Sequence, residues 1–185
     1  MTTALLVAYV ALHVAFTWGR IAVFRIDGLT PPGVRVIEHC AAASIAAGST
    51  LIAIRATGHA GLDCLGLALA VTSAGLFAWG VVTVQRKQLT AAFSADLPVS
   101  LITQGPFRYV RNPFYLAYIV AHAVPLLASR SPWALPGLLV MSAIYVRAAV
   151  LEERKFLRSD LAPAWRAYQR STGRFLPRLR SLEGS

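Results

Sequence analysis

The feature that most constrains this chain is the run from residue 64 to residue 84, which contains no charged side chain. In a helix that rises about 1.5 Å per residue, such a run extends about 30 Å, which is the thickness of the hydrocarbon core of a bilayer. Only 14% of the 185 residues are charged, whereas a soluble domain has about 25%. The run and the composition together predict an integral membrane protein.

Further apolar segments predict an all-α fold with about five transmembrane helices. We place these helices at residues 4–24, 37–54, 64–84, 114–128 and 132–150, with Ser129, Arg130 and Ser131 as a tight turn that makes a hairpin of the last two. The first segment lacks a basic leader and a clear cleavage site, so we interpret it as a retained span and not as a signal peptide. We expect a single membrane domain over 1–185, with a three-helix part at 1–98, a second part at 99–177 and a basic tail at 178–185.

The basic residues predict how the chain crosses the membrane. With the N-terminus outside and the C-terminus in the cytoplasm, all of the 18 Lys and Arg residues except Arg55 and Arg130 lie on the cytoplasmic side. We therefore predict this orientation, in the inner (plasma) membrane of the cell. A net charge of +10 in a soluble protein would suggest nucleic acid, but here the charges flank apolar spans. Anionic membrane lipids are thus the expected partner, and the partial apolar stripe of 151–168 predicts an amphipathic cytoplasmic tail.

A polar hinge at residues 101–115 separates the apolar spans from the hairpin. Gly105 and Pro106 must turn the chain, and Pro113 favours the first turn of the following helix. The segment between the two prolines contains Arg108, Tyr109, Arg111 and Asn112. Two cations, a phenol and an amide beside a helix N-terminus suit an anionic group such as a carboxylate. The alternative is a juxtamembrane loop whose arginines face lipid phosphates.

Two pairs of polar residues lie at the cytoplasmic ends of predicted spans. Glu152 and Glu153 follow the last span, where an ionised carboxylate is costly unless it has a partner or a ligand; the alternative is a solvated helix face. Glu38 and His39 begin the second span, and either pair with a neighbour such as Arg35 or contribute to acceptor binding. The chain has no His, Cys or carboxylate spacing typical of a metal site, and no glycine-rich dinucleotide-binding turn.

The hinge, the apolar hairpin and the paired glutamates, together with Tyr168 and the segment 174–177, resemble the isoprenylcysteine carboxyl methyltransferase family, whose superfamily includes phospholipid N-methyltransferases. The resemblance covers about residues 99–177, which makes this segment the methyltransferase core, and it implies S-adenosyl-L-methionine (S-adenosylmethionine) as the methyl donor. It implies cofactor contacts at Val99, Ser100, Leu101, Ile102, Phe107, Asn112, Pro113, Phe114, Tyr115 and Glu152, with Glu153 completing the paired-glutamate motif.

We extend the expected donor site to the rest of the hinge, namely Gln104, Gly105, Tyr109 and Arg111. Arg111, Asn112 and Glu152 are the candidate catalytic residues, in a positioning role and without an assigned general base. For the acceptor, the candidates are Arg147, Glu38 and His39, although Arg147 is one residue away from the acceptor-binding arginine of the eukaryotic enzymes.

The chain departs from the family pattern at several positions, one of which is Asp160-Leu161 in place of Phe-Gly. Asn112 replaces the usual histidine and cannot titrate, Phe107 replaces a tyrosine, and Trp165 stands where a tyrosine is common.

The leading hypothesis is transfer of a methyl group to a lipophilic small molecule or a lipid-modified acceptor, at a carboxylate or a hydroxyl. Methyl transfer needs mainly proximity and alignment of donor and acceptor. A phospholipid N-methyltransferase is the second enzyme hypothesis, and a non-catalytic membrane scaffold or small transporter is the third. Against the third, the polar residues gather at one face of the membrane, whereas transporters place them near its middle.

Overall fold

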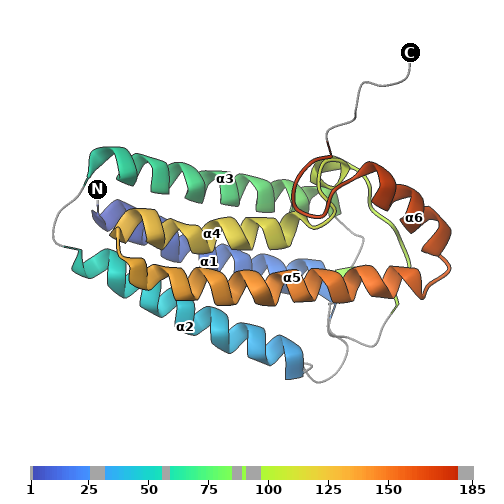
Figure 1. The fold of residues 1–185 in the computed structure, drawn as a ribbon, viewed down its shortest axis with the longest axis horizontal. Helices are drawn as coiled ribbons and strands as arrows, with labels where there is room; N and C mark the ends of the chain where they lie inside the picture. The colour runs from blue at the N-terminus through green and yellow to red at the C-terminus, as the bar shows by residue number, and fades with distance from the viewer. Residues whose placement is uncertain (1, 26–31, 56–58, 85–88, 91–96, 179–185) are drawn as a thin grey trace, which may run out of the picture.

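The computed structural model describes residues 2–25, 32–55, 59–84, 89–90 and 97–178, which form a bundle of five long helices with a sixth, shorter helix at one end (Figure 1). The helices are α1 (Thr2–Val23), α2 (Pro32–Ile54), α3 (Ala60–Val84), α4 (Pro113–Ser129), α5 (Leu135–Leu157) and α6 (Ala162–Ser171), with 3-10 turns η1 (Gly105–Arg108) and η2 (Pro132–Ala134). Two strands of two residues each, β1 (Phe24–Arg25) and β2 (Leu89–Thr90), pair in parallel. They are too short to change the all-α class.

The long helices make this an integral membrane protein. Thr2–Gly19, Pro32–Ile54, Ala60–Val84 and Pro132–Leu157 are long and apolar enough to cross a membrane, and α4 is an apolar helix of 17 residues. The predicted last span at 132–150 falls within η2 and α5, and α5 continues beyond it to Leu157. The charged residues of its last two turns stay in the helix because Glu152 and Glu153 have hydrogen-bond partners there.

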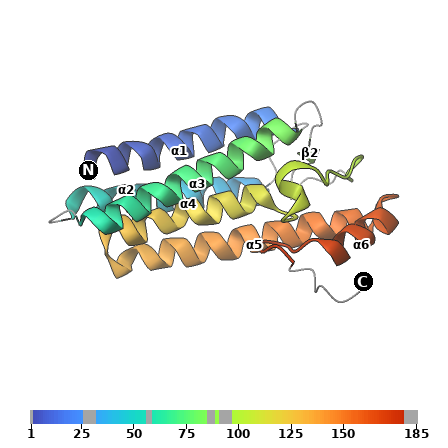
Figure 2. The same ribbon diagram turned by 90° about the horizontal axis from the view of Figure 1, so that it is seen from above.

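Helix α4 is the centre of the bundle and contacts α1, α2, α3 and α5 (Figure 2). Its small residues Ala117, Ala121 and Ala128 are fully buried, which lets neighbouring backbones approach closely in a membrane. The Ser73 hydroxyl of α3 donates a hydrogen bond of 2.7 Å to the carbonyl oxygen of Ala117. Aromatic side chains fill the space between α1, α3 and α4, where the ring centres of Phe16 and Phe77 lie 4.6 Å apart.

The two ends of the bundle differ in their polar chemistry. At the end where α2 stops and α3 begins, Arg55 donates to Asp63 over 2.9 Å and to the Thr2 hydroxyl over 2.9 Å, and also to the carbonyl oxygen of Ala128. Both charged side chains are only 2% exposed. The opposite end holds η1, the start of α4, the end of α5 and α6 (Figure 1). The contacts of Arg55 with Asp63, Thr2 and Ala128 join helix ends at the first end of the bundle. The opposite end contains the hinge and the paired glutamates.

Candidate functional site

The hinge turns where its glycine and prolines require it. Gly105 has a φ of 58°, in the left-handed region that favours glycine, and a side chain there would collide with Thr83 of α3. Pro106 is buried, and the amide N–H of Tyr109 donates 3.1 Å to its carbonyl oxygen. Pro113 then begins α4. The chain therefore enters α4 from a compact turn packed against α3.

The hinge pairs with a C-terminal segment that lies far away in the sequence. Val110 forms a parallel bridge with Gly173, and the amide of Arg111 donates 2.8 Å to the carbonyl oxygen of Gly173. The Tyr168 hydroxyl donates to the carbonyl oxygen of Phe107. Burial raises the pKa of the Tyr168 phenol above its ordinary value, which keeps it protonated as a donor. These contacts hold α6 and the residues after it against the hinge.

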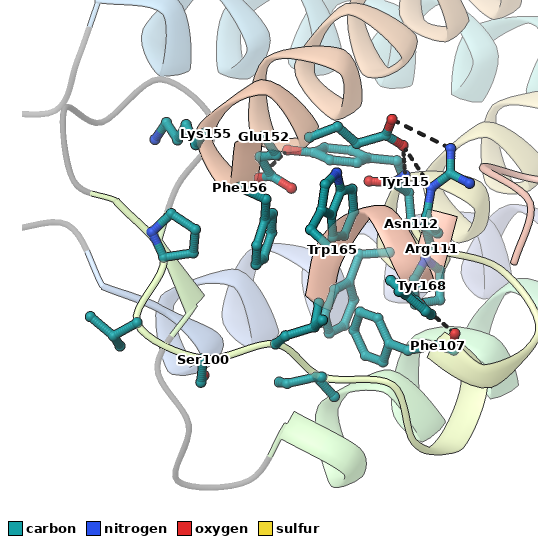
Figure 3. A pocket seen from close by; sticks show the side chains of 17 residues that line it. Ser100, Phe107, Arg111, Asn112, Tyr115, Glu152, Lys155, Phe156, Trp165 and Tyr168 are labelled. Atoms are coloured by element: carbon teal, nitrogen blue, oxygen red, sulfur yellow. Dashed lines mark hydrogen bonds and ion pairs between the residues drawn. The ribbon is translucent and has the colours of Figure 1, made fainter. Parts of the chain in front are cut away.

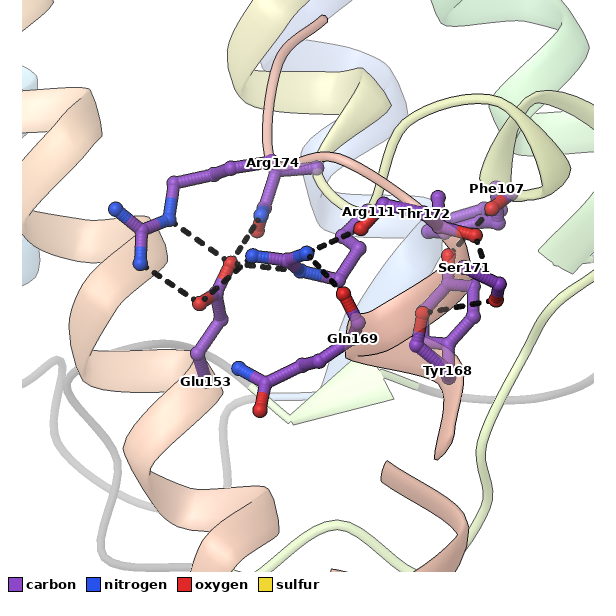
Figure 4. A network of polar contacts seen from close by, with 9 residues as sticks. Phe107, Arg111, Glu153, Tyr168, Gln169, Ser171, Thr172 and Arg174 are labelled. Atoms are coloured by element: carbon purple, nitrogen blue, oxygen red, sulfur yellow. Dashed lines mark hydrogen bonds and ion pairs between the residues drawn. The ribbon is translucent and has the colours of Figure 1, made fainter. Parts of the chain in front are cut away.

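Glu153 joins these segments to α5 (Figure 4). Its carboxylate accepts from Arg111 Nε at 3.2 Å, from Asn112 Nδ2 at 3.0 Å and from Arg174 Nε and Nη2 at 3.0 and 2.9 Å. Glu153 also raises the pKa of the Arg174 guanidinium above its ordinary value. The Glu153 side chain is 5% exposed, so it is a buried carboxylate with three partners from two segments.

A second nitrogen of the Arg111 guanidinium also has partners within the protein. Its Nη1 donates to the carbonyl oxygens of Thr172 and Gln169. The sequence predicted that Arg111 and Asn112 would meet an anion, and the anion beside them is Glu153. The expected charge complementarity is thus met within the protein itself.

Glu152, the residue before Glu153 in α5, lines a pocket (Figure 3). The Tyr115 hydroxyl donates 2.8 Å to its carboxylate. The pocket is lined by residues of the hinge and its N-terminal approach, of α4, of the end of α5 and of α6: Pro98, Val99, Ser100, Leu101, Ile102, Phe107, Arg111, Asn112, Pro113, Phe114, Tyr115, Glu152, Glu153, Lys155, Phe156, Trp165 and Tyr168. Glu152 therefore offers a carboxylate to a cavity with mostly apolar and aromatic walls.

The pocket brings together most of the donor-site residues that the sequence singled out, but not all of them. Gln104, Gly105 and Tyr109 lie outside its lining, and Tyr109 is 52% exposed beside Trp79. The three candidate acceptor residues also lie outside the lining. Arg147 is exposed on α5, and in α2 His39 is exposed and contacts the Arg35 carbonyl oxygen at 2.7 Å, while Glu38 is partly buried.

The sequence reasoning missed five lining residues as site residues, namely Pro98, Lys155, Phe156, Trp165 and Tyr168. Phe156 lies in the apolar stripe of 151–168, and Trp165 was named only as a position where the family commonly has a tyrosine. In the structure their rings stack with centres 4.4 Å apart and planes 11° apart. Lys155 was counted only among the basic residues of the cytoplasmic side. The partial apolar stripe predicted an amphipathic cytoplasmic tail, and it carried no signal that its apolar face borders a cavity.

Comparisons with known proteins agree with this arrangement. The family described as phospholipid methyltransferase matches residues 62–162. A curated relative, the nickel-cobalt-cadmium resistance protein NccN of Alcaligenes xylosoxydans xylosoxydans, is 28% identical over 123 residues, which are 66% of this chain and 57% of that protein. The chain thus spans little more than half the length of that relative. No solved structure matches the chain.

The matched residues begin at the start of α3 and end at the start of α6. They include the hinge, α4 and both glutamates of α5, and thus most of the pocket lining. Since the match covers more than half of the chain, this protein belongs to the phospholipid methyltransferase family of membrane methyltransferases.

Proposed function

We propose that the protein transfers a methyl group from S-adenosylmethionine to a lipophilic acceptor, at a carboxylate or a hydroxyl, at the inner face of the membrane. The observation that carries this proposal is the single pocket that contains both the hinge residues and Glu152. These segments lie about 40 residues apart in the sequence, and the hydrogen bond from Tyr115 to Glu152 joins them directly. Family membership supports a methyltransferase reaction.

The residues of the pocket suit this donor. Glu152 offers an anionic group for an ammonium or for ribose hydroxyls, and Phe107, Phe156 and Trp165 offer apolar surface for an adenine ring. When bound, the sulfonium group of the donor supplies an electrophilic methyl group. The role of the protein is to align the methyl donor with the acceptor and to keep water away from the acceptor.

The other polar residues of the site would act by positioning. Arg111 and Asn112 hold Glu153 and, through their own backbone, the C-terminal segment. This keeps the hinge, α5 and α6 at fixed distances around the pocket. An acceptor that is already ionised, such as a carboxylate, needs no general base, which agrees with the lack of a histidine at position 112. We assign no catalytic base.

The expected orientation suits the reactants. With the N-terminus outside and the C-terminus in the cytoplasm, the end of the bundle with α6 faces the cytosol, from which a water-soluble donor comes, and a lipophilic acceptor arrives through the bilayer. The exposed cations of α6 and the segment after it, Arg166, Arg170 and Arg178, would then face anionic headgroups. We propose the inner (plasma) membrane on this basis.

A phospholipid amine is the second candidate acceptor, because the family takes its description from phospholipid methylation. The pocket that receives the donor would be the same, and the difference lies in the methylated atom. A non-catalytic scaffold or transporter has less support. The chain belongs to a methyltransferase family, and a scaffold would not require the pocket at Glu152.

Incubation of purified protein with a lipid extract and S-adenosylmethionine labelled in its methyl group tests the proposal. Mass spectrometry of the lipids then shows whether label enters a methyl ester, a methyl ether or a methylated amine. The first two products agree with the leading proposal, and a methylated amine replaces it by the second. Absence of label from every lipid, together with no binding of S-adenosylhomocysteine in calorimetry, would refute a methyltransferase function.

Calorimetry also tests the role of Glu152. We expect Glu152→Gln to weaken the binding of S-adenosylhomocysteine at least about tenfold, since a hydrogen bond to a charged group contributes about 1.5–3 kcal/mol. Asp160→Asn is the matched control, because Asp160 is an exposed acid in the turn between α5 and α6 and lies outside the pocket lining. Equal affinities for all three proteins would remove Glu152 from the donor site.

A further inference from the structure

The pocket contains a hydrogen-bond donor that has no partner among the residues that the structure describes. The indole Nε1 of Trp165 is buried without a hydrogen bond, and the residue is 3% exposed. An indole nitrogen can only donate, and a buried donor without an acceptor costs about 1–3 kcal/mol. Since Trp165 lines the pocket, a ligand in the pocket can supply the missing acceptor.

Neighbouring side chains fix the direction of the Trp165 indole N–H. Phe156 stacks on the indole with ring centres 4.4 Å apart, and the guanidinium carbon of Arg111 lies 5.9 Å from the indole centre. Contacts of this kind cover ring faces and leave the ring edge, which carries the N–H. In Figure 3 the indole nitrogen points toward the part of the pocket where Tyr115 and Glu152 lie.

Two cations, Lys155 and Arg111, line the pocket, and Arg111 already has hydrogen-bond partners within the protein. Arg111 donates to Glu153 and to the carbonyl oxygens of Thr172 and Gln169. A carboxylate that enters the pocket would have to compete with this buried ion pair. The Trp165 N–H, in contrast, gains a bond without losing one.

The chemistry of the proposed donor selects the group that Trp165 would bind. Its amino-acid end carries an ammonium and a carboxylate on the same carbon atom, so their protein partners must lie close together. Glu152 suits the ammonium. A hydrogen-bond donor on the same side of the pocket, such as the Trp165 N–H, suits the carboxylate.

We infer that the indole N–H of Trp165 donates a hydrogen bond to the carboxylate of S-adenosylmethionine, and that this chain uses Trp165 for a role that Arg111 is not free to fill. The inference rests on the proposed function, because it assigns a residue to the same donor site. It makes Trp165 a binding residue for the donor.

Indole ¹⁵N labelling tests this contact directly. The chain has four Trp residues, and Trp18, Trp79 and Trp133 are all well exposed. Replacement of these three by Phe leaves Trp165 as the source of one indole N–H signal in full-length protein in detergent. Two ligands are compared, S-adenosylhomocysteine and its thiopropylamine analogue, which keeps the adenosine and the amine but lacks the carboxylate.

We expect S-adenosylhomocysteine to move the Trp165 indole proton signal downfield and the analogue to leave it near its position in the free protein. Trp165→Phe removes the N–H and keeps an aromatic ring. This variant should weaken the binding of S-adenosylhomocysteine about tenfold and the binding of the analogue less than about twofold, because only S-adenosylhomocysteine loses a hydrogen bond to a charged group. Trp133→Phe is the control, and it should leave both affinities unchanged.

Two results would overturn the inference while leaving the proposed function in place. One is binding of S-adenosylhomocysteine without a change in the indole signal. The other is an equal shift with both ligands, which would mean that the N–H meets the adenosine part. If the wild-type protein bound neither ligand, the proposed function itself would fail, and this inference with it.

Discussion

Replacement of Glu153 by Gln is the perturbation whose effect follows most directly from the structure. Glu153 and Arg111 form an ion pair in which the side chains are 5% and 7% exposed. Removal of one charge from a buried pair costs about 3–5 kcal/mol, because the other charge stays buried without compensation. The second cation, Arg174, is 39% exposed and can be compensated by water. We therefore expect a loss of about 3 kcal/mol, at the lower end of that range.

In a chain of this size, about 1 kcal/mol shifts the midpoint of thermal unfolding by about 2–4 °C. Glu153→Gln should therefore lower Tm in detergent by about 6–12 °C. The loss should be greatest where Glu153 attaches the segment after α6. Limited proteolysis with trypsin, which cleaves after Arg and Lys, should accordingly release the C-terminal segment faster from the variant than from the wild type.

Glu152→Gln is the matched control, since it makes the same chemical change one residue earlier in the helix. Glu152 accepts a hydrogen bond from Tyr115, and an amide oxygen can still accept it. The Tm of the Glu152→Gln variant should change by no more than about 3 °C, while its affinity for S-adenosylhomocysteine falls. If both variants lost the same stability, or if Glu153→Gln had none of these effects, the assignment of Glu153 to structure and Glu152 to binding would be wrong.

Three other changes test the framework of the fold by thermal unfolding in detergent. Asp63→Asn should cost about 3–5 kcal/mol by leaving the Arg55 charge buried, and a simultaneous replacement of Arg55 by Met and Asp63 by Leu should recover part of that loss; no recovery would contradict a buried-charge penalty. Gly105→Ala should lower Tm by several degrees, because a φ of 58° is strained for alanine by about 1–2 kcal/mol, and an unchanged Tm would mean that the turn adapts. Tyr168→Phe removes the bond to the Phe107 carbonyl oxygen and should cost about 1 kcal/mol, with faster tryptic cleavage after α6 as the second readout; equal cleavage rates would show that this bond does not hold α6.

The helices of this protein could be predicted closely from the sequence. A segment without charges in a membrane must satisfy its own backbone hydrogen bonds, and a helix does so within the segment. The predicted span at 64–84 therefore lies inside α3, and the tight turn at Ser129–Ser131 lies between α4 and η2. The run Glu152–Lys155 is too polar for a span, and it lies in α5 beyond the predicted span at 132–150, with Glu153 hydrogen-bonded to Asn112.

The site could be predicted in part. The residue types of the hinge indicated that its cations meet an anion, but the same types fit a ligand carboxylate and a protein carboxylate equally well. The contact between Arg111 and Glu153 crosses 42 residues, and no local pattern encodes it. For the same reason Trp165 resembled a core residue, because a buried aromatic ring has the same helical spacing whether or not a cavity lies beside it.

By itself, the sequence determined that this chain spans a membrane, turns sharply at Gly105–Pro106 and places two glutamates at the end of its last long helix. Apolar runs, proline and glycine act locally, so their consequences can be read along the chain. Only the tertiary structure decided that neighbouring glutamates have different surroundings, with Glu153 in a buried ion pair and Glu152 at a pocket. Residues next to each other on a helix point about 100° apart, so which partner each one meets depends on the segments that pack around it.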